Sequence, residues 1–303
     1  MNEPFAPLGR RLFLLVAIAI HATVFYCLIR IATEAGIPYL GFTFWQVVAG
    51  ALAVLVILLA RRTRVPMGWT HLRFYAISAL FGLAVPYLSI TYASAHIPVG
   101  VLSMTLTIEP AVTYLLALCL LLERFRTLRF AGLLLGIAGL LLILLPQASL
   151  PSREMVPWVL VCLAAPVSWA IWSNLMAVIR PPDIDSAVAS FGLLVIAALM
   201  LLPAAAAQGE LWWFDGPGSE LWWLLPIFGG LNTVLWIAGF ESVRISGPVF
   251  YSLWTLLATP ATIAAGMIFF TERHSLWIWS ALILLAASLW LVNRTMSAAR
   301  RRT

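Results

Sequence analysis

The sequence predicts an all-α integral membrane protein with ten transmembrane helices in two five-helix repeats of inverted topology. Composition, the length of the apolar runs and an internal repeat are the observations that predict it. The 303-residue chain is 63% hydrophobic and 10% charged, whereas soluble domains are about 45–50% apolar and about 25% charged. The apolar runs approach the roughly 20 residues that span a bilayer. They are continuous, unlike the alternating strands of a membrane β-barrel.

Ten apolar runs, separated by short polar segments rich in Pro, Gly or Arg, are the expected spans. They lie at residues 12–32, 40–60, 74–95, 99–122, 128–146, 157–178, 186–207, 221–243, 248–270 and 276–293. The longest connecting segment, around 208–220, is acidic and is flanked by Trp212, Trp213, Trp222 and Trp223. Paired tryptophans beside a polar loop are typical of the aromatic belt at a membrane surface.

All 18 basic residues are arginines, and their distribution orients the expected spans. With the N-terminus inside, fifteen of them fall on the cytoplasmic side and only Arg30, Arg153 and Arg273 on the other. Cytoplasmic loops of membrane proteins carry such an excess of positive charge, so we expect both termini in the cytoplasm. This topology, and not binding to nucleic acid, explains the formal charge of +6.

The composition disfavours several classes of enzyme. Without lysine the chain has no Walker-type phosphate loop and no pyridoxal Schiff base. Cys27, Cys119 and Cys162 lie singly within apolar runs, which favours packing roles over disulfides or a metal site. No HExxH motif or His/Cys cluster occurs in the sequence. We therefore expect no enzyme activity, no cofactor and no metal.

The two halves of the chain repeat a pattern at an offset close to 150 residues. The matched positions are Pro98 and Pro248, Thr105 and Thr255, Pro110 and Pro260, and, at an offset of 149, Glu123-Arg124 and Glu272-Arg273. Because five spans is an odd number, the second repeat would enter the membrane upside down. Inverted repeats are typical of secondary transporters, whose substrate sites lie near the midplane. We predict the two repeats at 1–148 and 149–303.

These motifs resemble a known family, the drug/metabolite transporter superfamily with its EamA-type repeat. The matching motifs are Glu109-Pro110-Ala111 through Leu122-Glu123-Arg124, the series Gly132, Gly136 and Gly139, and Trp169-Ala170-Ile171-Trp172. Within the superfamily the chain is most similar to bacterial exporters of aromatic amino acids and paraquat, which implies the bacterial inner membrane. It departs from the pattern at His21, where the first repeat usually has tryptophan, and at Thr259-Pro260 in place of a second Glu-Pro.

Two features of the fourth and ninth expected spans could serve transport. Pro110 and Pro260 lie near mid-span, where a proline removes a backbone hydrogen bond and the freed carbonyl must be satisfied by protein or water. We interpret them as paired hinges; static kinks are the alternative. Glu109 lies near the bilayer centre, where a carboxylate is a functional candidate by default. It could be ionised and pair with a substrate ammonium, be protonated and donate a hydrogen bond, or be structural.

The remaining candidates are polar and aromatic side chains at mid-span. His21 is compatible with packing or with proton transfer. A buried Tyr or Trp needs a partner for its O–H or N–H, so such residues favour a cavity over a lipid-facing position. Together they predict a largely apolar cavity with a few polar groups. The predicted substrate-binding residues are His21, Tyr87, Glu109, Trp169, Asn232, Trp236, Tyr251, Trp254 and Thr255.

The sequence thus predicts an inner-membrane exporter of amino acids, aromatic or otherwise amphipathic, that works by alternating access. The alternative keeps the fold but transports organic cations, held by cation–π contacts and Glu109. A membrane-embedded enzyme acting on lipid-linked substrates would need polar catalytic residues clustered at one interface, and none is apparent. The inverted repeat disfavours a passive channel. The expected partners are a small-molecule substrate and the bilayer, without nucleic acid, and a monomer is compatible with the sequence.

Overall fold

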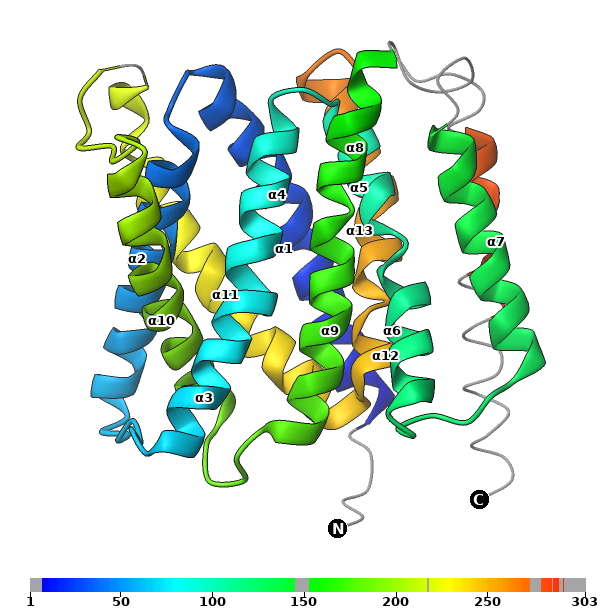
Figure 1. Ribbon diagram of the computed structural model, residues 1–303, viewed down its shortest axis with the longest axis horizontal. Helices are drawn as coiled ribbons and strands as arrows, with labels where there is room; N and C mark the ends of the chain where they lie inside the picture. The colour runs from blue at the N-terminus through cyan, green and yellow to red at the C-terminus, as the bar shows by residue number, and fades with distance from the viewer. Residues whose placement is uncertain are drawn as a thin grey trace.

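The computed structural model describes residues 7–144, 153–216, 218–272, 279–284, 286–288 and 291, and these residues form helices and no strands (Figure 1). The helices run up and down side by side as a bundle. In chain order they are α1 (Leu8–Glu34), α2 (Tyr39–Ala60), α3 (Trp69–Ser78), η1 (Ala79–Ala84), α4 (Val85–Ser94), α5 (Val99–Leu106), α6 (Glu109–Cys119), α7 (Thr127–Leu144), η2 (Arg153–Met155), α8 (Val156–Cys162), α9 (Ala164–Ile179), α10 (Ser186–Ala207), η3 (Ser219–Leu221), α11 (Leu224–Ser246), α12 (Pro248–Tyr251) and α13 (Trp254–Phe269).

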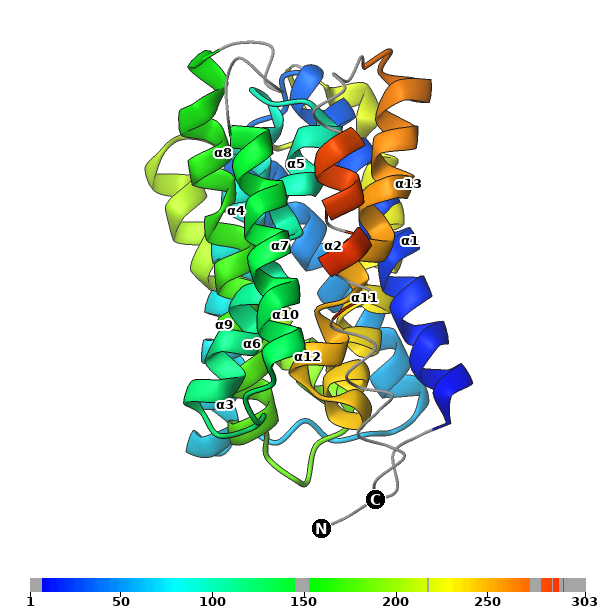
Figure 2. The same cartoon turned by 90° about the vertical axis from the view of Figure 1, so that its right-hand side faces the viewer.

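Within the described residues, eight helices are long and apolar enough to cross a membrane. They are Leu8–Glu34, Tyr39–Ala60, Trp69–Ser94, Val99–Cys119, Arg153–Ile179, Ser186–Ala207, Leu224–Ser246 and Pro248–Phe269. Each falls on one of the ten expected spans. The fifth expected span, 128–146, falls largely on α7, and the tenth, 276–293, lies partly outside the described residues. Figure 2 shows α7 on the same side of the bundle as the described part of 279–291. A Cβ on Gly136 of α7 would lie 3.2 Å from the Ser288 hydroxyl.

Four of the eight long segments are interrupted. The π-helix η1 joins α3 to α4, Leu163 separates α8 from α9, and short turns at 107–108 and 252–253 separate α5 from α6 and α12 from α13. Irregular backbone at membrane depth is tolerated only where protein buries it or it lines a cavity. Thr107 and Ser252, within the two turns, are buried, and their hydroxyls donate to backbone carbonyls of the preceding turn.

Local sequence explains where the helices begin. Pro7, Pro38 and Pro98 immediately precede α1, α2 and α5, positions at which the missing N–H of proline costs nothing. The Asp185 carboxylate accepts a 2.8 Å hydrogen bond from Val188 N and caps α10. Gly247, at φ +81°, ends α11 and allows α12 to begin at the next residue.

The described arginines divide between the two ends of the bundle. Figure 1 shows the start of α1, the link from α2 to α3, the link from α6 to α7 and the link from α9 to α10 at one end, below. Most of the described arginines belong to these segments, among them Arg10, Arg11, Arg61, Arg62, Arg64, Arg124, Arg126 and Arg180. The last turns of α1, with Arg30, and the start of η2, with Arg153, lie at the other end.

Segments 99–123 and 248–272 run in opposite directions beside each other. In Figure 1, α5 lies above α6 whereas α12 lies below α13. Thr259 of α13 donates a 3.3 Å hydrogen bond to the Ser103 carbonyl of α5. Both segments end in the same turn: Glu123 N donates to the Ala117 carbonyl and Glu272 N to the Gly266 carbonyl, each at 3.2 Å.

Candidate functional site

A small cavity inside the bundle brings together six of the nine predicted site residues. These are His21, Tyr87, Trp169, Trp236, Tyr251 and Trp254. They come from α1, α4, α9, α11, α12 and α13, so helices from both halves of the chain form its wall. Ala22, Phe25, Tyr26 and Leu235 complete the lining. Apart from a few polar atoms the wall is aromatic, which is typical of a small-molecule site.

Aromatic rings close this cavity almost completely. Its volume is about 10 Å³, which is room for about one water molecule. The rings of Trp169 and Trp254 meet edge to face at 5.4 Å, and those of Phe25 and Tyr87 lie 5.0 Å apart. A substrate of several heavy atoms would therefore enter this cavity only if these rings separated.

Several polar atoms around the cavity have no hydrogen-bond partner within the described chain. They are both ring nitrogens of His21, the Tyr26 hydroxyl and the indole nitrogens of Trp172, Trp236 and Trp254. The Trp169 indole differs, because it donates a 2.8 Å hydrogen bond to the Gly82 carbonyl in η1. Buried polar groups are normally satisfied, and a cluster of unsatisfied ones is the pattern expected where a ligand completes the bonding.

The Glu109 carboxylate is buried beside this cavity without lining it. The side chain is 0% exposed, and neither oxygen accepts a hydrogen bond from the described residues. The Trp254 indole interacts with this carboxyl group, although their geometry is not that of a standard hydrogen bond. A carboxylate in an apolar interior is costly unless it is paired or protonated, so this group is the strongest candidate for a ligand contact.

Two predicted site residues stand behind the cavity wall. The Tyr87 hydroxyl donates a 2.7 Å hydrogen bond to Asn232 Oδ1, and Asn232 Nδ2 donates to the Phe228 and Gln46 carbonyls. Asn232 therefore fixes the orientation of Tyr87 and does not face the cavity. Thr255 is also buried, and its hydroxyl donates to the Ser252 carbonyl at 2.9 Å, which ties the start of α13 to the preceding turn.

The turns that interrupt the helices do not coincide with the prolines that we interpreted as hinges. Pro110 is the second residue of α6, just after the turn at 107–108, whereas Pro260 lies inside α13, seven residues beyond the turn at 252–253. The two turns nevertheless place helix starts near the site, because α6 begins at Glu109 and α13 begins at Trp254. Two helix N-termini with partial positive charge thus lie next to the cavity.

Comparison with known proteins assigns the chain to a family. Residues 10–145 match the EamA-like transporter family. An uncharacterized protein of Pseudomonas aeruginosa is 31% identical over 258 residues, which cover 80% of this chain and 85% of that protein. The chain belongs to the EamA-like transporter family.

Other relatives agree with this assignment. The riboflavin transporter of Brucella anthropi is 22% identical over 282 residues, covering 91% of this chain and 97% of the relative. The uncharacterized transporter YvbV of Bacillus subtilis is 26% identical over 274 residues, covering 86% of this chain and 84% of the relative. One solved crystal structure superposes with a TM-score of 0.64 at 21% identity, covering 94% of this chain and 98% of that one, which is a likeness of fold. The protein is a multi-pass membrane transporter, and the match to aromatic amino acid and paraquat exporters is not shown by these relatives.

The helical spacing of residues in α1 indicates two further aromatic residues of the cavity wall, Phe25 and Tyr26, which are not among the predicted site residues. His21, Ala22, Phe25 and Tyr26 are spaced as one face of a helix, and all four line the cavity of this EamA-family transporter. Tyr26 contributes one of the unpartnered hydroxyls. No group of three or more His, Cys, Asp or Glu able to hold a metal ion occurs in the described ranges.

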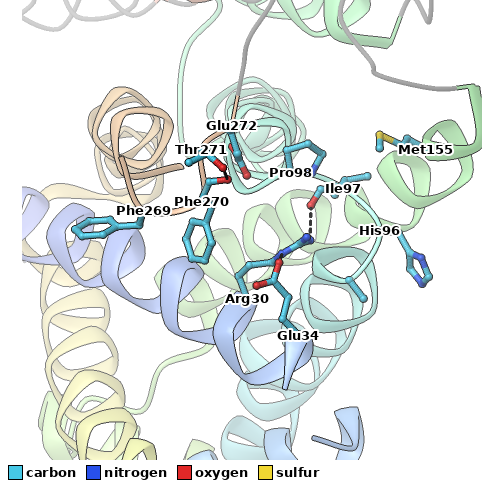
Figure 3. A pocket seen from close by; sticks show the side chains of 11 residues that line it. Arg30, Glu34, His96, Ile97, Pro98, Met155, Phe269, Phe270, Thr271 and Glu272 are labelled. Atoms are coloured by element: carbon cyan, nitrogen blue, oxygen red, sulfur yellow. Dashed lines mark hydrogen bonds and ion pairs between the residues drawn. The ribbon is translucent and has the colours of Figure 1, made fainter. Parts of the chain in front are cut away.

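A larger pocket, of about 540 Å³, opens at the end of the bundle where α1 ends and α5 begins (Figure 3). Arg30 reaches across it to the carbonyls of Ser94 and Ile97, and it also pairs with Glu34. The Glu272 carboxylate, just beyond α13, accepts hydrogen bonds from Val99 N at 2.6 Å and Gly100 N at 3.1 Å. These two hydrogen bonds join the start of α5 to the end of α13, between this pocket and the interior of the bundle.

At the opposite end Glu241 joins three segments of the transporter. Its carboxylate accepts from Arg10 at 2.7 Å, from Arg244 at 2.7 and 2.9 Å and from the Ser186 hydroxyl at 3.0 Å. Arg180, in the link after α9, donates to the Phe240 and Ile184 carbonyls. Burial, followed by the charge of nearby Arg244, lowers the pKa of the Arg180 guanidinium from its ordinary value. Charged side chains therefore link neighbouring helices at both ends of the bundle.

Proposed function

We propose that this transporter exports amino acids, aromatic or otherwise amphipathic, across the bacterial inner membrane by alternating access. The observation that carries the proposal is the buried Glu109 carboxylate, which has no partner among the described residues and lies beside an aromatic cavity. An amino acid brings the ammonium group that this carboxylate lacks, and a charge-assisted hydrogen bond between them would offset the cost of burial.

The rest of the substrate meets groups that the cavity offers. An apolar or aromatic side chain would insert between the rings of Trp169, Trp254 and Tyr87, which must separate to admit it. The substrate carboxylate needs donors, and the indole N–H groups of Trp236 and Trp254 are unpaired. The N-terminus of α13, which begins at Trp254, adds partial positive charge.

The proposal includes ten spans in two inverted repeats, with the substrate site between them. Support comes from the antiparallel segments 99–123 and 248–272 with their shared final turns. Helix α7 and the helical residues 279–284 and 286–288 would be the fifth and tenth spans. The arginine-rich end would face the cytoplasm, together with both termini. One chain contains the whole cavity, so the proposed unit is a monomer.

Organic cations form the second candidate class of substrate. The cavity wall is made chiefly of Phe, Tyr and Trp rings, and a cation over the face of such rings is attracted by their quadrupoles. Glu109 would supply the negative charge. A quaternary ammonium has no N–H to donate, so it would gain from this site by charge and ring contact alone.

Counterflow into liposomes that contain the purified protein tests both candidates. The panel comprises aromatic and aliphatic amino acids, quaternary ammonium compounds and riboflavin, the last because one relative carries that name. We expect saturable counterflow of aromatic amino acids. If Glu109 is ionised and pairs with the ammonium, Glu109→Gln should lower transport about tenfold or more, from the loss of about 1.5–3 kcal/mol of charge-assisted hydrogen bonding.

The pair Glu109→Gln and Glu109→Ala separates the states of this carboxyl group. A protonated Glu109 that only donates a hydrogen bond would tolerate the nearly isosteric glutamine but not alanine. Thr259→Ala, at the corresponding position of the second half, is the matched control and should transport normally. Normal transport by both Glu109 variants would remove Glu109 from the site, and transport of cations alone would replace the amino-acid proposal with the second candidate.

A further inference from the structure

The link between α2 and α3, together with the start of α3, carries positive charge that no acid in the described part of the chain neutralises. Arg61, Arg62, Arg64 and Arg73, which we call the α2–α3 arginine patch, are all exposed. None of the four side chains makes an ion pair or hydrogen bond within the described part of the chain. By contrast, Arg10, Arg180 and Arg244 at the same end bind Glu241 or backbone carbonyls.

The two acids in the link between α9 and α10 are already engaged. The Asp183 carboxylate lies 2.9 Å from His71 Nε2, two residues before Arg73. The Asp185 carboxylate caps α10 through Val188 N. Within the described residues, no acid therefore compensates the charge of the patch.

The link that carries the patch would lie at the level of the lipid headgroups. Its segment joins one span that ends at Ala60 to another that begins at Trp69, so the eight linking residues stay close to the bilayer surface. Two apolar side chains in or beside the link are exposed, Met67 at 66% and Trp69 at 79%. Tryptophan is enriched at the interface between membrane and water, where its ring contacts the headgroup level.

The link also holds a defined conformation. Thr63 N donates to the Leu58 carbonyl at 3.0 Å, the Tyr75 hydroxyl donates to the Pro66 carbonyl at 3.3 Å, and His71 N donates to the Gly68 carbonyl at 2.9 Å. The arginines therefore extend from an ordered frame, which lowers the entropy cost of binding. Guanidinium groups bind phosphate in a bidentate way that a lysine ammonium cannot match.

We propose that the α2–α3 arginine patch is a binding site for the headgroups of anionic phospholipids, with Trp69 inserted beside them. The site anchors one end of the bundle to the charged leaflet through α2 and α3. It is separate from the central cavity and does not depend on the substrate of the transporter.

The test measures phosphatidylglycerol bound to the purified full chain by native mass spectrometry, and its effect on thermal unfolding in vesicles of phosphatidylcholine with or without phosphatidylglycerol. A positive charge near an anionic surface contributes about fivefold in affinity, so the triple variant R61Q/R62Q/R64Q should lose about a hundredfold in phosphatidylglycerol binding. R61K/R62K/R64K, which keeps the net charge and the topology signal, should lose part of it. Raising the ionic strength to about 1 M, where screening extends only about 3 Å, should remove the advantage of phosphatidylglycerol for the wild type.

The variant R300Q/R301Q/R302Q is the matched control, since it removes the same number of arginines from a run outside the described residues. It should bind phosphatidylglycerol like the wild type. Equal losses in the two triple variants would overturn the proposal in favour of a general charge effect. Retention of phosphatidylglycerol by R61Q/R62Q/R64Q, or competition by inorganic phosphate at similar concentration, would also overturn it.

Discussion

Segments 99–123 and 248–272 are built to the same plan, and they differ in where the chain breaks and in one polar residue. Each has a short helix, a turn, a longer helix and a final turn closed by the same 3.2 Å hydrogen bond. The break precedes Glu109-Pro110 directly in the first segment, whereas it lies seven residues before Pro260 in the second. The order of helices and turns is therefore the same in both segments, whereas the position of the interrupting turn relative to the proline differs.

The polar chemistry of the two segments differs more than their backbone. Thr259 stands where the first segment has Glu109, and its hydroxyl donates to the Thr255 carbonyl at 2.7 Å. Glu109 has no such local partner. Of these two corresponding positions, only Glu109 therefore has a buried side chain without a hydrogen-bond partner among the described residues.

The largest expected effect compares Trp254 with Met104, its counterpart 150 residues earlier. Both are buried, but only Trp254 lines the cavity. Met104→Ala should lower the free energy of unfolding by about 2–5 kcal/mol and leave transport per folded molecule unchanged. Trp254→Ala should lower both, with about 3–5 kcal/mol lost from stability. Thermal unfolding and counterflow on the same preparations measure the two quantities.

Trp254→Phe then isolates the indole N–H, because phenylalanine keeps most of the apolar contact. We expect near-normal stability with reduced transport. Wild-type transport by Trp254→Phe would show that the indole does not contact the substrate.

A smaller effect compares the two prolines. A proline inside a helix costs about 3 kcal/mol or more, whereas one in the first turn costs little. Pro260→Ala should therefore raise the unfolding temperature, and Pro110→Ala should leave it nearly unchanged. If the α13 proline provides the flexibility that we propose for a hinge, the stabilised Pro260→Ala transporter should also be slower. Faster or unchanged counterflow would identify Pro260 as a static kink.

The smallest effect concerns the contact by which Glu272 fastens the end of α13 to the start of α5. Glu272→Gln weakens two hydrogen bonds from Val99 N and Gly100 N to a charged group, about 1.5–3 kcal/mol in all. The pocket end of the bundle should open more often as a result. We expect a cysteine placed at Ala22, on the cavity wall, to react about tenfold faster with a membrane-impermeant thiol reagent, in a background lacking the three native cysteines.

Glu34→Gln is the control for this experiment. It makes the same change in the same pocket, but the exposed Glu34 carboxylate pairs only with the partly exposed Arg30 side chain, and solvent-exposed ion pairs contribute little. Equal labelling in the two variants would mean that the Glu272 contact does not hold this end closed.

Hydropathy alone predicted ten spans, and eight of them are confirmed within the described residues, because the free energy of burying an apolar helix in lipid depends on composition and length. Hydropathy could not predict where turns interrupt the helices. Pro110 occupies a position where proline is harmless, and Pro260 is accommodated within a continuous helix. Nothing local in either sequence distinguishes these outcomes, since neighbouring helices decide whether a freed carbonyl is satisfied.

The candidate site was predictable where it depended on residue type and not where it depended on long-range pairing. The polar and aromatic residues predicted at mid-span include His21, Trp169 and Trp254, which the structure places on the wall of one cavity. The position of Asn232 behind Tyr87 joins residues 145 apart, and the Glu272 contact spans 173 residues. Such partners follow from the three-dimensional packing and leave no periodic pattern in the sequence.

The polar atoms without hydrogen-bond partners around the cavity of about 10 Å³ bear on the rate of the proposed transport cycle. Each buried group left without a hydrogen bond costs about 1–3 kcal/mol, and one water can serve only a few of them. In the proposed alternating-access cycle, a substrate that forms hydrogen bonds with these atoms would therefore stabilise the closed conformation. Return of the unloaded carrier should limit the cycle, so exchange of labelled for unlabelled substrate across the liposome membrane should run several times faster than net efflux.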